Sequence, residues 1–352
     1  MKKIDEIDKN FKVETKLGKT DIEFYSVLES PFSVYGLIYE NGKFRRMPKD
    51  VAKSVSEGVL YLHSNTAGGR VRFRTDSPYV AISAKMEKIG KMDHFAMTGS
   101  AGFDMYVREN GKEKYTTTFR FDVDITDGYE SLFDFKSTNM REITIHFPLY
   151  SDVKELYIGL YEGAKIEAPT PYKYDKPIAY YGSSITQGGC ASRPGNAYPA
   201  IISRELDVDH INLGFSGNAR AEQEIADYIA TLDLGIFVYD YDHNAPNSEH
   251  LEKTHEKMFK TIRKANPNLP VIMMTTTTLE RFFDSRERRR NIIYKTYENA
   301  KANGDQNVYF WDGGVAFEEY QDSGTVDGCH PNDYGFVGIA SSLEPIIKKI
   351  LG

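Results

Sequence analysis

The sequence predicts a two-domain protein, in which an antiparallel β-sandwich is followed by an α/β domain built on a parallel sheet. Three observations carry this prediction. Apolar and polar residues alternate with a period of two in the first half of the chain, short apolar runs alternate with helical periodicity in the second half, and a proline-rich stretch separates the halves. A chain of 352 residues is also long enough for two domains of ordinary size.

The β-sandwich prediction comes from alternation and from turn signals. Apolar side chains alternate with polar ones in residues 70–75, 119–125 and 142–147, as in strands with one buried face. Two Asn-Gly pairs, at 41–42 and 110–111, suit type I′ turns, whose central residues need positive φ. Residues from roughly 20 to 168 therefore predict an antiparallel sandwich of short strands.

The boundary between the halves is predicted at three closely spaced prolines, Pro169, Pro171 and Pro177. Proline clusters are typical of linkers. We therefore divide the chain into an N-terminal domain of residues 1–168, a linker of residues 169–177 and a C-terminal domain of residues 178–352.

The second half alternates five apolar runs with segments of helical periodicity. Apolar side chains recur on one helical face in residues 225–232, 251–262 and 336–350. Strands that alternate with helices form a parallel sheet covered on both faces, so we expect a three-layer α/β/α domain. Active sites in such sheets lie beyond the carboxyl ends of the strands. The predicted strands are residues 178–181, 210–213, 236–239, 271–275 and 308–311.

The composition is that of a globular protein with a slight excess of acid. The chain is 40% hydrophobic and 27% charged, and its formal net charge is −7. This charge argues against nucleic acid as a partner, because nucleic-acid binding depends on cations that neutralise phosphates. The chain contains no apolar run of ~18 residues, so no membrane span is predicted. Residues 1–10 lack the apolar region of a signal peptide, so we expect a cytoplasmic protein, although a chain whose leader had been removed would look the same.

A candidate nucleophile follows the first strand of the predicted sheet. Ser184 comes directly after a strand and a glycine, in residues 181–186, at the expected start of a helix. Its hydroxyl would be exposed there, and backbone N–H groups would surround a developing oxyanion. The alternative is that Ser184 only caps the helix, since serine is a preferred N-cap residue.

A candidate base and acid precede the last helix. A serine hydroxyl needs an adjacent base to become a good nucleophile. His330 can supply that base, and Asp327, three residues earlier, can hold the imidazole in the required tautomer. The alternative is a surface turn in which the aspartate caps backbone amides.

Two further strand ends carry candidate oxyanion donors. Gly217, in the loop after residues 210–213, could bring its backbone N–H close to a substrate because it has no Cβ. Asn244, after residues 236–239, could donate from an amide that does not titrate. The alternatives are a glycine-rich turn and an ordinary polar loop.

Taken together, these segments resemble the SGNH (GDSL-like) hydrolase family over residues from about 178 to 352. The blocks GSSIT, NLGFSGN, DYDHNAP and DGCHP occur in the family's order. The resemblance implies a flavodoxin-like fold with Ser184 as nucleophile, Asp327 and His330 completing a triad, and Ser184, Gly217 and Asn244 as oxyanion donors. It implies no metal or organic cofactor. Two blocks depart from the family, because Ser183 replaces the usual aspartate and because Asp242 or His243 could fill the position that we give to Asn244.

The first half resembles the GxDLY-type, jelly-roll-like domain that precedes some SGNH hydrolases, through the residues Gly102-Phe103-Asp104-Met105-Tyr106. Proteins with this layout include bacterial carbohydrate acetylesterases. The resemblance therefore implies an esterase that deacetylates oligosaccharides such as those of mannan or xylan, with a possible carbohydrate-binding role for the sandwich. Two alternatives stay open: an esterase or lipase for other small acyl esters, and a carbohydrate-binding protein with weak catalysis. The sequence does not give the oligomeric state.

Several residues near these blocks have a less specific expected role. Arg193, Tyr198 and Asp242 are candidate substrate contacts, with loop packing as the alternative for Arg193 and Tyr198. The arginines of residues 286–290 are expected on a solvated helix face that pairs with nearby acids. Cys190 and Cys329 are expected to stay as thiols in a reducing cytoplasm.

Overall fold

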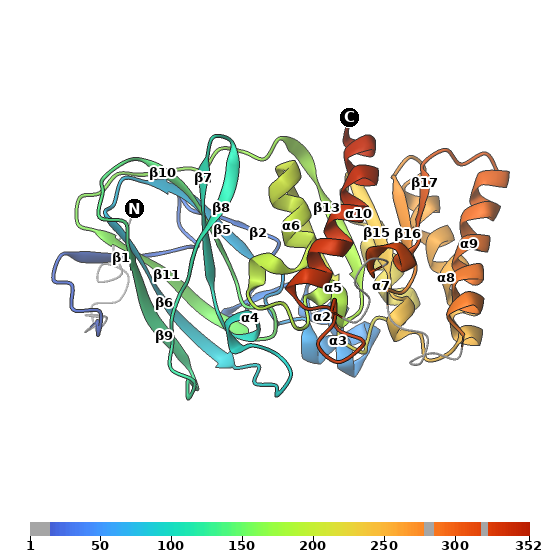
Figure 1. The fold of residues 1–352 in the computed structure, drawn as a ribbon, viewed down its shortest axis with the longest axis horizontal. Coiled ribbons are helices and arrows are strands. Elements are labelled where there is room, and N and C mark those ends of the chain that lie inside the picture. The colour runs from blue at the N-terminus through green and yellow to red at the C-terminus, as the bar shows by residue number, and fades with distance from the viewer. Residues whose placement is uncertain (1–14, 278–284, 318–322) are drawn as a thin grey trace. The chain divides into compact units, whose positions relative to one another are not determined.

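In the computed structural model the described residues are 15–277, 285–317 and 323–352. They form two compact units, drawn as ribbons in Figure 1. The first unit comprises the described residues up to Arg46, together with Ser64–Pro171 and Arg193–Gly195. The second comprises Met47–His63, Tyr172–Ser192 and the described residues from Asn196 onward. This division differs from the continuous one drawn from the sequence, because residues 47–63 belong to the second unit.

The first unit contains two antiparallel sheets. One has the strand order β1-β11-β6-β9, and the other has the order β12-β5-β10-β7-β8, with β2 paired to β5. A separate hairpin joins β3 to β4. The strands are β1 Ile22–Ser26, β2 Ser33–Tyr35, β3 Ile38–Glu40, β4 Lys43–Arg45, β5 Arg70–Thr75, β6 Tyr79–Lys88, β7 Asp104–Glu109, β8 Lys112–Thr118, β9 Gly128–Asp134, β10 Arg141–His146, β11 Asp152–Tyr161 and β12 Ile166–Glu167, and one short helix is α4 Met97–Ser100.

The two sheets of the first unit share one apolar core. Phe73 and Ile145 from one sheet and Ile82 and Ile158 from the other are all fully buried in it. This arrangement confirms the predicted β-sandwich, since alternating side chains of both sheets point inward. The two Asn-Gly pairs connect β3 to β4 and β7 to β8 with positive φ at all four residues, as type I′ turns require.

Two details of the first unit differ from the prediction. Residues 119–125 are a loop between β8 and β9 and not a strand, although Phe119 and Ile125 are buried in the core. Arg72, on the predicted polar face of β5, is fully buried, and its Nη2 lies 2.8 Å from Oε1 of Glu142. A buried arginine needs such a partner, because an uncompensated charge in the interior is costly.

The second unit is built on a five-stranded parallel sheet with the order β14-β13-β15-β16-β17. All five strands coincide with the predicted apolar runs, so the fold class is confirmed. The strands are β13 Tyr174–Gly182, β14 Val208–Gly214, β15 Ile236–Asp240, β16 Val271–Met274 and β17 Val308–Trp311. β13 begins inside the predicted linker.

Helices cover both faces of this sheet. The α-helices are α2 Lys49–Val55, α3 Glu57–Leu62, α5 Ser184–Gln187, α6 Tyr198–Leu206, α7 Gln223–Ala230, α8 Ser248–Ala265, α9 Arg286–Ala302 and α10 Asp333–Leu351, with 3₁₀ turns η2 Asp242–Asn244 and η4 Gly313–Phe317. A further 3₁₀ turn, η1 Pro194–Asn196, begins in the segment that belongs to the first unit. One core joins a sheet face to α7, α8 and α9, and residues of α2 and α3, among them Val59, extend this core. Tyr198 of α6 contacts Tyr180, which points to the opposite face from Tyr181, and α10 packs against α6.

The strand order puts a topological switch point at β13. β14 and β15 both follow β13 in the chain and lie on opposite sides of it in the sheet. The connection from β13 to β14 and the connection from β14 to β15 therefore run in opposite directions across the sheet. Crevices for ligands form beyond the carboxyl ends of strands at such a point. Ser184, Gly217 and Asn244 all follow these three strand ends.

Candidate active site

The end of β13 is shaped to present Ser184. A Cβ on Gly182 would lie 2.3 Å from the carbonyl oxygen of Asp240, so the strand can end this close to β15 only as glycine. Ser183 then caps α5, because its Oγ accepts a hydrogen bond of 3.1 Å from the backbone N–H of Ile185. Capping therefore falls to Ser183. The partly exposed Ser184 is the first residue of the helix, and its hydroxyl is not needed as the cap.

Ser184, His330 and Asp327 form a hydrogen-bonded chain. Oγ of Ser184 lies 2.9 Å from Nε2 of His330, and Nδ1 of the same ring lies 2.8 Å from Oδ2 of Asp327. The three side chains come from residues that are 146 and 3 positions apart in the chain. In this order they can move a proton from the serine hydroxyl to the imidazole while the carboxylate stabilises the resulting imidazolium.

The Asp327 carboxylate is held in its charged form. Its Oδ1 accepts hydrogen bonds from the backbone N–H groups of Cys329 and His330, at 2.9 and 2.7 Å. Partial burial would raise the pKa of Asp327, but the hydrogen bonds from the His330 ring and from the two amides outweigh burial and hold the pKa at about 2. The carboxylate is thus oriented by one oxygen and binds the imidazole with the other.

The loop that carries Gly217 is bonded to the helix of the serine. The backbone N–H of Ser216 donates a hydrogen bond of 3.1 Å to Oε1 of Gln187, the last residue of α5. Gly217 has φ of +69°, which favours glycine. Asn218 closes the turn through a side-chain hydrogen bond of 2.6 Å to the Ser216 carbonyl, and Gly58 of α3 packs directly against the Asn218 side chain.

Asn244 ends the 3₁₀ turn η2, directly after β15. Its Nδ2 donates a hydrogen bond of 2.8 Å to the carbonyl of Phe215, so the loops after β14 and β15 are joined by one side chain. Because an asparagine amide has two N–H bonds, a second donor stays on the same nitrogen.

Asp242 is not placed to contact a substrate. Its side chain is buried, with Oδ1 2.9 Å from Nη1 of Arg289 and Oδ2 accepting a 3.0 Å hydrogen bond from the backbone N–H of Thr276. Both oxygens of this buried carboxylate thus have partners within the protein, so the side chain is not directed toward a ligand. The sequence-based assignment of Asp242 as a substrate contact therefore conflicts with its position.

The position of Tyr198 also conflicts with its predicted role as a substrate contact. The ring is fully buried, and the hydroxyl lies 3.2 Å from both Thr186 Oγ1 and Asp240 Oδ2. Thr186 donates a second, shorter hydrogen bond of 2.8 Å to the Asp240 carboxylate. Tyr198 is thus part of an internal network that lies under the helix of Ser184.

Arg193, the third candidate contact, belongs to the first unit. Its guanidinium lies 4.0 Å from the ring centre of Tyr115, and Nη1 donates a hydrogen bond of 3.3 Å to the hydroxyl of Tyr106. These contacts match the alternative of local packing, in which a cation stacks on aromatic rings.

Sequence reasoning missed the role of Arg289. The arginine run was expected on a solvated face, and Arg288 and Arg290 do pair near the surface, with Glu249 and Asp312. Arg289, however, is only 2% exposed and pairs with Asp242. The partners are 47 positions apart in the chain, so no local pattern signals the pair.

His243 lies beside the candidate site. Nε2 of His243 is 3.0 Å from Oγ1 of Thr276. Burial, together with smaller effects of the charges of His330, Arg289 and Arg286, lowers the pKa of His243 to about 3. His243 is therefore neutral at physiological pH.

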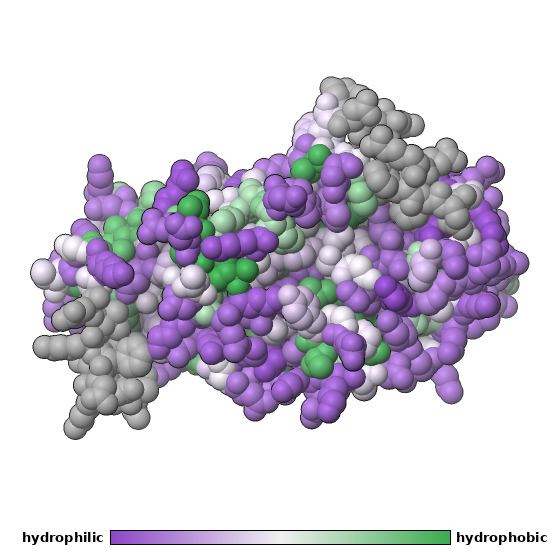
Figure 2. Space-filling view, turned by 90° about the horizontal axis from the view of Figure 1, so that it is seen from below, coloured by the Kyte–Doolittle hydropathy of each residue, from purple (hydrophilic) through white to green (hydrophobic). Residues whose placement is uncertain are grey.

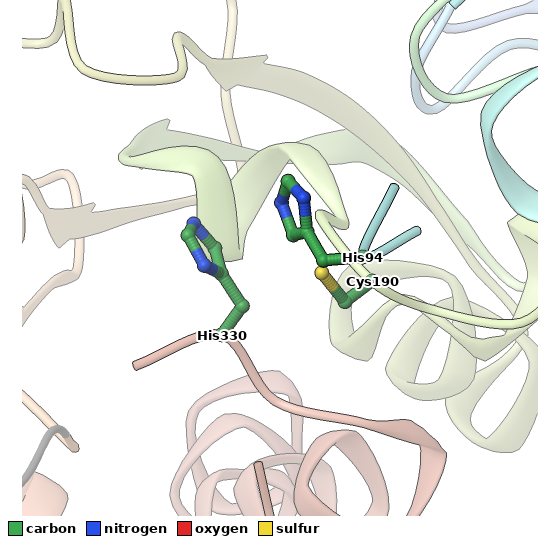
Figure 3. A group of neighbouring side chains, drawn as sticks. All are labelled: His94, Cys190 and His330. Atoms are coloured by element: carbon green, nitrogen blue, oxygen red, sulfur yellow. The ribbon is translucent and has the colours of Figure 1, made fainter. Parts of the chain in front are cut away.

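The two cysteines are both thiols. Sγ of Cys190 lies within 4.8 Å of a ring nitrogen of His330, and Figure 3 shows these two side chains next to each other. Burial raises the pKa of Cys190 to about 12, with smaller contributions from Asp327 and Cys329, so Cys190 is protonated beside the imidazole.

Two protein-family models match the two halves of the chain. Residues 175–348 match the GDSL-like lipase/acylhydrolase family, and residues 22–166 match the N-terminal domain of SGNH-hydrolase-type esterases. Together the two matches span most of the chain, which therefore belongs to the SGNH (GDSL-like) hydrolases of the two-domain type. The predicted family is confirmed. The chain matches no curated protein.

Solved structures share the whole two-domain fold. A Bacteroides ovatus protein assigned as a GDSL-like lipase is 29% identical, with a TM-score of 0.84 over 94% of this chain and 98% of its own. A salicylyl acyltransferase from a tetracycline biosynthetic pathway is 20% identical, with a TM-score of 0.77 over 95% of this chain and 99% of its own. A family two carbohydrate esterase from Clostridium thermocellum, in complex with cellohexaose, is 14% identical, with a TM-score of 0.63 over 91% of this chain and 99% of its own.

Within the described residues, no helix is both long and apolar enough to cross a membrane. The face drawn in Figure 2 is largely hydrophilic and shows small, separate hydrophobic groups of atoms.

Proposed function

We propose that the protein is a serine esterase that removes acetyl groups from carbohydrate. The observation that carries this proposal is the hydrogen-bonded chain from Ser184 through His330 to Asp327, at 2.9 and 2.8 Å. The chain joins a nucleophile, a base and an acid in the order that acyl transfer requires. It lies at the switch point of the parallel sheet, where ligands bind in this class of fold.

The reaction begins when Oγ of Ser184 attacks the carbonyl carbon of an acetyl ester and Nε2 of His330 takes the hydroxyl proton. The negative charge then moves to the carbonyl oxygen. The backbone N–H groups of Ser184 and Gly217 and the side-chain amide of Asn244 are the proposed donors to this oxyanion. Collapse of the intermediate breaks the ester bond, and the sugar hydroxyl leaves with the proton from His330.

The second half of the reaction restores the enzyme. Water attacks the acetyl group on Ser184, and His330 again acts as the base. The second tetrahedral intermediate releases acetate, and the proton on His330 returns to the oxygen of Ser184. Throughout both halves Asp327 stays ionised, because its pKa of about 2 lies far below the working pH. These steps use only the chain's own residues.

The carbohydrate part of the proposal has its support in structures of the same fold. Family two carbohydrate esterases from Clostridium thermocellum and Cellvibrio japonicus and an acetyl xylan esterase from Butyrivibrio proteoclasticus align with more than nine-tenths of this chain. At 12–14% identity they show a shared fold, and their activity is brought to this chain as a hypothesis.

Mass spectrometry of acetylated oligosaccharides tests this function. Mannan-derived and xylan-derived mixtures are incubated with the full-length protein and, separately, with Ser184→Ala. We expect the wild type to remove acetyl groups, which lowers the mass of the oligosaccharides, and Ser184→Ala to leave the masses unchanged. Equal loss of acetyl groups with Ser184→Ala would refute the assignment of Ser184 as the nucleophile. Unchanged oligosaccharides, together with Ser184-dependent hydrolysis of aryl esters that rises with acyl chain length, would refute carbohydrate as the substrate.

A further inference from the structure

One arginine of the second unit makes several buried contacts with the turn that carries Asn244. Arg289 lies in the first turn of α9, and its guanidinium is almost completely buried. Nη1 donates to the backbone carbonyl of Asp242 at 2.8 Å and to Oδ1 of the same residue at 2.9 Å. Nη2 donates to the carbonyl of Ala245 at 2.8 Å. The three acceptors belong to Asp242 and Ala245, the residues directly before His243 and directly after Asn244.

The turn is also held by hydrogen bonds of its own backbone. Its internal hydrogen bonds run from the N–H of Asn244 to the carbonyl of Tyr241 and from the N–H of Ala245 to the carbonyl of Asp242. The last residue of β15 is Asp240, so the sheet does not hold residues beyond it. A short 3₁₀ turn with two internal bonds is weak when it stands alone. Its geometry therefore depends on the contacts that it makes with α9 and with Thr276.

We infer that Arg289 is a positioning residue that sets the direction of the Asn244 side chain toward the oxyanion. This inference rests on the proposed function, because it assigns Asn244 as a donor. The guanidinium reaches one carboxylate and two carbonyl oxygens at once, which its planar, fork-like set of N–H bonds allows. Asn244 is thus held from two sides, by its own hydrogen bond to Phe215 and by Arg289 at the ends of its turn.

Lysine is the informative substitution because it keeps the charge but not the fork. A lysine ammonium can pair with the Asp242 carboxylate, so Arg289→Lys leaves no uncompensated buried carboxylate. It cannot reproduce the planar arrangement that spans Asp242 and Ala245. The fold should therefore survive, while the turn loses part of its alignment.

The test is a double-mutant cycle on the hydrolysis of p-nitrophenyl acetate by the full-length protein. We expect Arg289→Lys to lower kcat by about 10- to 100-fold with little change in KM, because a misplaced donor affects mainly the transition state. In an Asn244→Ala background the same substitution should lower kcat less than about 3-fold, since the donor it positions is already gone. Arg288→Lys, on the exposed neighbour, is the matched control and should leave kcat unchanged.

Each outcome decides between this inference and a general loss of structure. Wild-type kcat in Arg289→Lys, or a full loss that persists in the Asn244→Ala background, would overturn the positioning role. Wild-type kcat in Asn244→Ala would also overturn it. In that case an inactive Ser184→Ala variant would still support the proposed esterase function. Activity retained in Ser184→Ala would instead overturn the proposed function. If circular dichroism shows that Arg289→Lys is unfolded, the neutral pair Asp242→Asn with Arg289→Gln is tested with the same expectations.

Discussion

The side-chain amide of Asn244 lies 2.8 Å from the carbonyl oxygen of Phe215, and this contact joins the loops that follow β15 and β14. The loop of Phe215 also carries Gly217. The loops that carry Asn244 and Gly217, the two candidate oxyanion donors outside α5, are therefore joined by a hydrogen bond before a substrate arrives. Preorganised donors of this kind need no rearrangement when charge develops, which is the main source of their catalytic effect.

The first prediction concerns the donor itself. Asn244→Ala should lower kcat for p-nitrophenyl acetate by roughly 10²–10³-fold, with a smaller change in KM, because the lost hydrogen bond forms mainly in the transition state. Steady-state kinetics measures both constants. Asp242→Ala should act differently and lower the free energy of unfolding by about 3–5 kcal/mol, because it leaves the buried Arg289 without its carboxylate. If Asp242→Ala gave a stable protein with the kinetic loss and Asn244→Ala did not, Asp242 would occupy the donor position.

The second prediction separates two adjacent serines. Ser183→Ala should cost about 1 kcal/mol of unfolding free energy, because Ser183 caps α5, and should keep most of the esterase activity. Ser184→Ala should keep wild-type stability and lose activity by several orders of magnitude. Thermal unfolding and aryl acetate hydrolysis, measured on both variants, give the comparison. Loss of activity in Ser183→Ala and loss of stability alone in Ser184→Ala would indicate that Ser184 is the helix cap.

The third prediction concerns Asp327, the acid of the proposed triad. Asp327→Asn should lower kcat by about 10³–10⁴-fold, because an amide no longer holds the neutral His330 in the tautomer that accepts the proton of Ser184. The folded-state pKa of Asp327 is below the unfolded value, so its stabilising effect is present above about pH 4 and is lost as the pH falls through about 2. Asp327 is therefore ionised at both pH 6 and pH 8, and the loss of kcat should be present at both pH values. A loss confined to one of these pH values would contradict the assignment.

The fourth prediction uses the buried carboxyl of Asp240, which is hydrogen-bonded to Thr186 of α5. Burial raises the pKa of Asp240 from 3.8 to about 7, although hydrogen bonds from Thr186 and Tyr198 oppose this effect. The folded state thus keeps a proton that the unfolded state loses, so stability falls as the pH rises from about 4 to about 7.

Asp240→Asn removes this ionisation. Between pH 5 and pH 8 the wild type should lose about 2 kcal/mol of unfolding free energy that the variant does not lose. Urea unfolding at both pH values measures the difference. Parallel pH dependence in the two proteins would show that Asp240 does not titrate in this range.

The sheet and the candidate triad could be predicted from the sequence because their signals are local. Each strand of the second unit is a short apolar run, and its end is marked by a glycine or a polar residue. Asp327 and His330 are three residues apart, so one loop brings them together. Ser184 could be predicted because it follows a strand and a glycine closely in the sequence.

Other parts of the structure lack such signals. Residues 119–125 alternate like a strand, but the chain there forms a loop that buries Phe119 and Ile125 without pairing. α2 and α3 have seven and six residues, which is too short for a clear helical period. The burial of Arg289 depends on an acid 47 positions away, and a sequence pattern does not reveal a contact at that separation.

The helices of residues 47–63 have a consequence for the order in which the chain is made. They are synthesised before the sheet of the second unit, so Val59 and Leu62 become buried only after later members of the same core, such as Ile225 and Ile229, have been made. The second unit is thus assembled from stretches of the chain that are separated by Ser64–Pro171 of the first unit. A gene divided at the prolines would give one piece with two surplus helices and another with an uncovered apolar surface.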